Sequence, residues 1–307
     1  MARRKKGDRV NGWIVLDKRL AMTSTQAVGA VRRLFNAQKA GHGGTLDPLA
    51  TGLLPIALGE ATKTVPFIMD GTKTYRFTVE WGAETSTDDA EGEITQTSDN
   101  RPDEAAIRQL LPKFTGLISQ VPPQFSALKV DGARAYDLAR DGETVELASR
   151  EITVDAFELT EQPDADHAVF EAVCSKGTYV RALARDMGRE LGCYGHVSAL
   201  RRTKVGPFNE DDMILLDQLD ELRHKGAGQE AMYEYLLPLE TALDDIPALA
   251  VSGEDAARLR NGQAVIVRGR DAPILQGTIL VENRGDPVAL AEMDQGALQP
   301  KRVFNLT

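Results

Sequence analysis

Alternating apolar and polar residues predict several strands in the first two thirds of the chain. The run from Tyr75 to Trp81 alternates with a period of two, which places Tyr75 on the same face as Phe77 and Trp81. This segment is expected to be a half-buried strand. Further strand-like runs occupy residues 11–16, 150–160 and 168–174.

Two other segments carry apolar residues at helical spacing. After Thr23, which has the spacing of a capping box, apolar residues recur on one face as far as Phe35. A second amphipathic helix is expected from Val180 to the stop signal at Gly192, with Arg181 in its first turn. Strands and helices in this mixture predict an α+β fold, with a mixed or antiparallel sheet flanked by helices.

The pattern changes near Pro247, where short strands at close spacing replace the longer elements. We expect a basic tail over residues 1–10, a large domain over 11–246 and a small β-rich domain over 247–307. Residues 119–148 are rich in loop signals, and long loops in compact domains are usually functional or disordered. A surface insertion of no special role is the alternative for that segment.

Composition is typical of a soluble globular protein, with 42% hydrophobic and 27% charged residues among 307. No apolar run approaches the ~20 residues that cross a bilayer. The basic N-terminus lacks the apolar stretch of a signal peptide, so we expect a cytoplasmic protein without membrane attachment. The two cysteines, Cys174 and Cys193, and the four dispersed histidines do not have metal-site spacing, and no metal is expected.

Charge is distributed unevenly along the chain, whose net charge is −10. Residues 80–104 hold nine acidic residues against one basic residue, Arg101, and we expect this stretch to form a solvated face turned away from RNA. Basic residues gather in the N-terminal tail, which could equally be a disordered solubility tail, and around Arg201 and Arg202. The phosphate backbone of a nucleic acid is bound by cationic side chains. The cluster around Arg201 and Arg202 is therefore expected to line a groove.

One glycine-rich segment, residues 41–52, carries a single acid, Asp47, with His42 five residues before it. Glycine lets a backbone approach a ligand closely, and Pro48 restricts the conformation of the aspartate before it. The segment is expected to present one carboxylate into a cleft. The alternative is a helix start with Asp47 as its N-cap and Pro48 at its first position.

This segment resembles the catalytic motif of the TruB family of tRNA pseudouridine-55 synthases. Further segments resemble the same family in its order, and together they span about residues 11 to 210: residues 73–75, 122–129, 132–136, 176–181 and 200–202. Each piece is weak alone, but the ordered set is specific. Two departures are the lack of proline and glycine after Lys18 and the presence of Gly43 where many members have threonine.

The resemblance implies an enzyme that isomerises uridine 55 in the T loop of tRNA. It would flip the base, break the glycosidic bond with help from one aspartate, and reattach the base through C5. No cofactor is implied, and no dinucleotide or phosphate-binding loop is visible. The C-terminal domain would be a PUA-like RNA-binding module, and residues 119–148 an RNA-clamping loop.

Length and close motif match suggest a stand-alone bacterial-type monomer that binds the tRNA T arm without an obligatory protein partner. The guide-RNA-dependent relatives of the family work inside multiprotein particles. A competing hypothesis is a module that binds and folds tRNA, with catalysis secondary.

The resemblance assigns three catalytic residues. Asp47 would supply the carboxylate, Arg181 its cationic partner, and Tyr75 would stack on the target base and relay the C5 proton. Asp47 could attack C1′ or C6 as a nucleophile, or remove the C2′ proton as a base, and the sequence leaves both roles open. Core packing is the alternative for Tyr75, and a surface phosphate contact or a local ion pair is the alternative for Arg181.

The remaining candidates would bind substrate. His42 would meet the extruded nucleotide, Tyr179 and Leu200 would form pocket walls, and Lys18 would support the catalytic loop. Ordinary core packing competes with the role of both walls. The complete set of candidate substrate-binding residues is His42, Tyr179, Leu200, Lys18, Lys129, Arg201 and Arg202.

Overall fold

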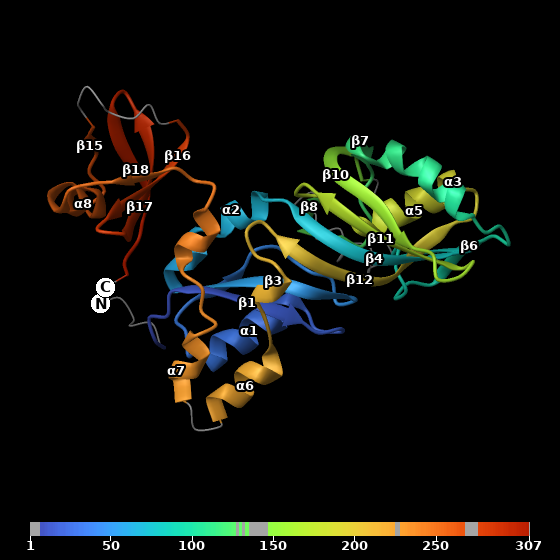
Figure 1. Cartoon of the computed structure of the whole chain (residues 1–307), viewed down its shortest axis with the longest axis horizontal. Coiled ribbons are helices and arrows are strands. Elements are labelled where there is room, and N and C mark those ends of the chain that lie inside the picture. The colour runs from blue at the N-terminus through green and yellow to red at the C-terminus, as the bar shows by residue number, and fades with distance from the viewer. Residues whose placement is uncertain are drawn as a thin grey trace.

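A computed structural model describes residues 7–126, 129–130, 133–134, 147–224, 228–267 and 276–306. Figure 1 shows a large twisted sheet with helices packed along it and a smaller β-rich part at the C-terminal end. The predicted α+β class and the β-rich C-terminal part are both confirmed. No helix in these ranges is long and apolar enough to cross a membrane.

The large sheet has nine strands and is mixed. Along it lie β13 (Met213–Leu215), β1 (Gly12–Lys18), β3 (Ala50–Leu58), β12 (Gly195–Val205), β4 (Lys73–Trp81), β11 (His167–Cys174), β10 (Arg150–Glu161) and β7 (Gly116–Gln120), while β2 (Ala40–His42) pairs with β3. Strands β1 and β13, and strands β3 and β12, run parallel, and the other neighbours are antiparallel. The alternation predicted from Tyr75 to Trp81 is confirmed in β4.

Strand β12 joins the two halves of this sheet. It pairs with β3 on one side and β4 on the other, so that Leu200 lies opposite both Ala50 and Phe77. Because Ala50 begins β3 three residues after Asp47, this register brings Leu200 beside the loop that carries Asp47. The polar run that includes Arg201 and Arg202 interrupts the alternation of apolar and polar residues in β12. This explains why the alternation did not predict that strand.

Helices α1 (Ser24–Leu34) and α5 (Val180–Glu190) pack on the large sheet within one apolar cluster. Helix α1 contacts β3, and α5 contacts β12 and β4. The capping box at Thr23 and the amphipathic helix that starts at Val180 are confirmed. The other helices among the described residues are α2 (Val65–Asp70), α3 (Glu104–Leu110), α6 (Leu216–His224), α7 (Gly228–Tyr233) and α8 (Gly253–Arg260), with short 3-10 helices at Gly59–Lys63, Leu111–Phe114, Glu210–Asp212 and Leu239–Leu243.

The C-terminal sheet has five strands in the order β14 (Ala248–Ala250), β16 (Thr278–Asn283), β17 (Asp286–Asp294), β18 (Ala297–Val303) and β15 (Val265–Ile266). It has an apolar cluster of its own, shared with α8. A further cluster joins Leu280, Leu290 and Phe304 to Trp13 and Phe208 of the large sheet region. The two parts of the chain are therefore attached through buried apolar side chains as well as through the connecting segment.

Two short hairpins complete the described strands: β5 (Ala83–Thr85) with β6 (Ile94–Thr97), and β8 (Lys129–Val130) with β9 (Ala133–Arg134). Most of the segment 127–146 lies outside the described residues, and the expectation of a clamping loop there stays a prediction. The alternative of a helix start at Asp47 is wrong. A turn follows Asp47, whose carbonyl accepts a hydrogen bond from Ala50 N, and strand β3 begins at once.

The close pairing of β3 and β12 requires glycine at position 52. Gly52 has a φ of +93°, and a Cβ atom there would lie 2.3 Å from the carbonyl oxygen of Arg202. Gly116 is a matched control, because its φ is +90° but a Cβ atom would meet nothing within 4 Å. We expect Gly116→Ala to lower the free energy of unfolding by about 1–2 kcal/mol from backbone strain alone. Gly52→Ala should lower it by about 3 kcal/mol or more.

Urea denaturation of both variants measures these free energies. Equal losses of unfolding free energy for Gly52→Ala and Gly116→Ala would show that the close approach of β3 and β12 does not itself require glycine at position 52.

Candidate active site

The loop that carries Asp47 connects β2 to β3, and the Arg202 side chain holds it in place through hydrogen bonds. The Arg202 side chain is almost fully buried, with the residue 1% exposed. Its guanidinium donates to the carbonyls of Leu53 at 2.8 Å, Gly44 at 3.0 Å and Thr45 at 3.4 Å. A planar guanidinium with several donors suits such a cluster of carbonyls, and it fixes the loop on both sides of its bend.

Two further contacts fix the loop on the side of α1. The ammonium of Lys18 is buried and donates to the carbonyls of Met22 at 2.8 Å and Pro48 at 3.4 Å. Burial lowers the pKa of Lys18 to about 8. Ser24 exchanges hydrogen bonds with the backbone of Leu46, at 3.0 Å to its oxygen and 2.9 Å from its nitrogen. Lys18 thus lies where it can support the loop, as expected from the sequence.

Arg181 makes an ion pair with the Asp47 carboxylate. The distance from Nη2 to Oδ2 is 2.9 Å, and the Arg181 side chain is 5% exposed whereas that of Asp47 is 39% exposed. The same guanidinium donates to the carbonyls of Thr87 at 2.8 Å and Phe125 at 3.0 Å, and its Nη1 lies 3.4 Å from Oδ2 of Asp89. The protein therefore fixes the arginine, and the aspartate keeps an open side.

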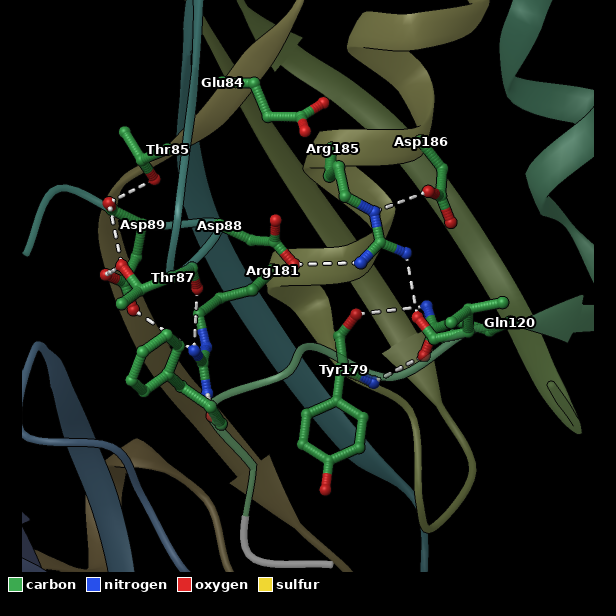
Figure 2. A network of polar contacts seen from close by, with 12 residues as sticks. Glu84, Thr85, Thr87, Asp88, Asp89, Gln120, Tyr179, Arg181, Arg185 and Asp186 are labelled. Atoms are coloured by element: carbon green, nitrogen blue, oxygen red, sulfur yellow. Dashed lines mark hydrogen bonds and ion pairs between the residues drawn. The ribbon is translucent and has the colours of Figure 1, made fainter. Parts of the chain in front are cut away.

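The acidic stretch forms the expected solvated face only in part, because its acids between residues 91 and 104 are exposed but three earlier ones are not. Glu84, Asp88 and Asp89 are buried, which corrects that expectation at these positions. Figure 2 shows Asp88 and Asp89 turned towards arginines of α5. The pairs are Asp89 with Arg181 at 3.4 Å, Asp88 with Arg185 at 2.9 Å and Glu84 with Arg189 at 2.6 Å.

The sequence does contain one signal for this arrangement. Arg181, Arg185 and Arg189 recur at every fourth position, so they form a stripe along one face of α5. A cationic stripe on an amphipathic helix that packs on the sheet needs acidic partners where it is buried, because buried charge is tolerated only when it is paired.

A pocket of about 550 Å³ opens beside this ion pair. Its lining includes the predicted residues Asp47, Tyr75, Tyr179, Arg181, Leu200 and Arg202. Burial raises the pKa of the Tyr75 phenol, and nearby Arg202 opposes that shift. The phenol is therefore neutral near pH 7, and it presents an aromatic surface and an O–H group within the same pocket as the carboxylate.

Arg150 and Lys73 also line the pocket, and the sequence reasoning did not single out either side chain. The guanidinium carbon of Arg150 lies 4.8 Å from the centroid of the Tyr179 ring, which suits a cation–π contact. Lys73 donates to the carbonyl of Met69 at 2.6 Å, near the end of α2. The alternation of β4 was the available signal for Lys73, since it shares the face of Tyr75.

Other candidates lie outside the lining of this pocket. Both terminal nitrogens of Arg201 contact Asp17 at 3.0 Å, and its Nε contacts Glu210 at 2.9 Å. His42 is half buried, burial lowers its pKa, and its Nδ1 has no hydrogen-bond partner among the described residues. The side chain of Lys129 lies outside what the structure describes.

Gly43 follows His42 on this loop and packs closely against α2. A Cβ atom at position 43 would lie 2.5 Å from Cγ2 of Ile68. In this chain the isoleucine fills the space that a larger residue at position 43 would need.

Comparisons with known proteins identify the family of this chain. The family model described as "TruB family pseudouridylate synthase (N terminal domain)" matches residues 32–180. The model described as "tRNA pseudouridylate synthase B C-terminal domain" matches residues 181–244. A protein of Bradyrhizobium diazoefficiens named tRNA pseudouridine synthase B is 64% identical over 97% of this chain and 87% of its own length. One of the same name from Brucella anthropi is 53% identical over 99% of both.

Solved structures with a similar fold include a chain of a Cbf5-Nop10-Gar1 complex. It is 27% identical, with a TM-score of 0.75 over 96% of this chain and 85% of that one. A chain of an H/ACA ribonucleoprotein bound to a substrate RNA containing 2'-deoxyuridine is 25% identical, with a TM-score of 0.74 over 99% and 92%. Sequence motifs, pocket geometry and these relatives lead to one conclusion: the chain belongs to the TruB family of pseudouridine synthases.

Proposed function

We propose that this protein isomerises uridine 55 in the T loop of tRNA to pseudouridine. The observation that carries the proposal is the ion pair between half-exposed Asp47 and buried Arg181 at the edge of the pocket. A single carboxylate, held by a cation and open on one side, is the group that an isomerisation without added water requires. The homologues named tRNA pseudouridine synthase B support tRNA as the substrate.

The reaction exchanges one glycosidic bond for another. The bond between N1 and C1′ breaks, the base turns, a bond forms between C5 and C1′, and the C5 proton moves to N1 by way of solvent or the protein. Nothing else is gained or lost. Asp47 acts on the target nucleoside either as a nucleophile at C1′ or C6, or as a base at C2′.

The uridine must leave the folded T loop before it can enter the pocket, and such base flipping costs a few kcal/mol. Tyr75 and Leu200 would contact the flipped base, because both line the pocket beside Asp47. Stacking on an aromatic ring contributes about 1–3 kcal/mol per base in single-stranded recognition, which would offset much of that cost. His42, the last residue of β2 before the Asp47 loop, would contact the nucleotide from the other end of that loop.

The wider organisation is part of the same proposal. Residues 11–246 would form the catalytic domain, the segment 119–148 would close on the RNA, and residues 247–307 would act as a PUA-like RNA-binding domain. The protein would act as a cytoplasmic monomer without an obligatory protein partner.

Replacing the carboxylate tests the proposal directly. Asp47→Asn keeps the size of the side chain and removes its charge, so we expect no tritium release from tRNA labelled at C5 of uridine, with tRNA affinity unchanged. Glu171→Gln serves as the control: Glu171 is half exposed on β11, so this variant should react at the wild-type rate. Turnover by Asp47→Asn would remove this residue from the chemistry.

Absence of pseudouridine from the wild-type reaction, despite tight binding, would favour the competing hypothesis of a tRNA-binding and folding module.

Asp89 is the second carboxylate that contacts Arg181, and we expect it to affect the reaction rate by orienting that arginine. Asp89→Asn removes one of the charges that hold the guanidinium, and a misplacement of about 1 Å can slow a reaction about 100-fold. We expect the single-turnover rate at saturating tRNA to fall about 10- to 100-fold, with an unchanged dissociation constant for tRNA. A wild-type rate for Asp89→Asn would show that Thr87 and Phe125 suffice to hold Arg181.

A further inference from the structure

A second buried ion pair lies one helical turn behind the catalytic one. Arg185 contacts Oδ2 of Asp88 through Nη1 at 2.9 Å, and Oδ1 of Asp186 through Nε at 2.8 Å. The side chains of Arg185 and Asp88 are each 9% exposed. Neither residue lines the pocket, so neither touches the substrate in the proposed reaction.

Asp88 adopts a backbone conformation that ordinary residues avoid. Its φ is +61°, in the left-handed region, where aspartate and asparagine are tolerated better than most other residues. Its backbone nitrogen donates to the carbonyl of Thr85 at 3.2 Å, and its carbonyl accepts from the nitrogen of Val197 at 3.1 Å. The turn this creates presents the next residue, Asp89, to Arg181, as Figure 2 shows.

Arg185 also holds a second segment that reaches the catalytic arginine. Its Nη2 donates to the carbonyl of Val121 at 2.8 Å, just after the end of β7. Four residues further on, the carbonyl of Phe125 accepts from Arg181. Besides Asp47, the contacts of Arg181 thus come from two segments, one around Asp88 and one around Val121, and Arg185 is bonded to both.

We propose that Arg185, together with Asp88, is a positioning residue for the reaction. It fixes the left-handed turn before Asp89 and the segment before Phe125, and so sets the orientation in which Arg181 meets Asp47. This inference rests on the proposed isomerase function.

The surroundings of Asp88 indicate which substitutions the site should accept. Burial raises the pKa of Asp88 to about 6, while Arg185, Arg181 and Arg189 oppose the shift and Glu84 adds to it. The folded protein therefore accepts the neutral carboxyl group more readily than an exposed site would. Asparagine is neutral, keeps an oxygen for the Arg185 hydrogen bond and tolerates the left-handed conformation.

The first experiment compares two arginines of α5 in single-turnover reactions with tRNA labelled at C5 of uridine. Arg185→Met should react about 10- to 100-fold more slowly at saturating tRNA, with an unchanged dissociation constant. Arg189→Met is the control, because Arg189 lies one turn further along, bonds Glu84 and has a side chain that is 53% exposed. Equal rates for Arg185→Met and Arg189→Met would overturn the proposal.

The second experiment asks whether Arg185 acts through Asp89. If it does, adding Arg185→Met to Asp89→Asn should slow the reaction little beyond Asp89→Asn alone, because residues that act through one network are not additive. A purely structural role predicts that the two losses multiply, and that result would overturn the proposal.

Substitutions of Asp88 keep the inference testable if Arg185→Met fails to fold. Asp88→Asn should react at close to the wild-type rate. Asp88→Val lacks the acceptor and disfavours a positive φ, so it should lose as much rate as Arg185→Met, with thermal melting confirming that it is folded. A folded Asp88→Val with the wild-type rate would contradict the proposal. A wild-type protein that forms no pseudouridine would instead contradict the proposed function.

Discussion

The Asp47–Arg181 ion pair depends on a buried guanidinium whose two terminal nitrogens are both engaged by the protein. Arg181 is 5% exposed and bonds two carboxylates and two carbonyls. A charge withdrawn from water is stable only when its partners are well placed, and removal of a partner is costly. These four contacts hold the guanidinium in one orientation.

This constraint explains why so much of the surrounding structure is polar and yet buried. The stripe of arginines along α5 requires the buried acids of residues 84–89, and those acids require a turn that departs from regular structure at Asp88. On the other side of the pocket, Arg202 and Lys18 hold the Asp47 loop through backbone carbonyls. Both halves of the ion pair are thus preorganised, which is how electrostatic catalysis avoids reorganisation during the reaction.

The sequence predicted the elements whose signals are local. The capping box at Thr23, the alternation around Tyr75 and the amphipathic helix at Val180 depend on residues within a few positions of one another. Asp47 and Arg181 were paired only through the resemblance to a family, and the structure brings them to 2.9 Å. No local pattern could have joined two residues so far apart in the chain.

The features that the sequence did not predict depend on contacts between residues that lie far apart in the chain. Asp89 was assigned to a solvated acidic face, because composition does not show that its partner lies on a helix about ninety residues away. Arg202 was expected to bind substrate and does line the pocket, but its role in holding the carbonyls of the Asp47 loop was not expected. The turn after Asp47 was open to a helical reading, because aspartate followed by proline suits both structures.

The most direct test of the account is the single-turnover rate of Arg181→Lys, which keeps the positive charge and removes the planar fork. Lysine cannot bond Asp47, Asp89 and two carbonyls from one position. The account predicts a rate far below that of the wild type with unchanged tRNA binding. A rate near that of the wild type would show that charge alone is sufficient, and that the fixed geometry around Arg181 is not what the reaction depends on.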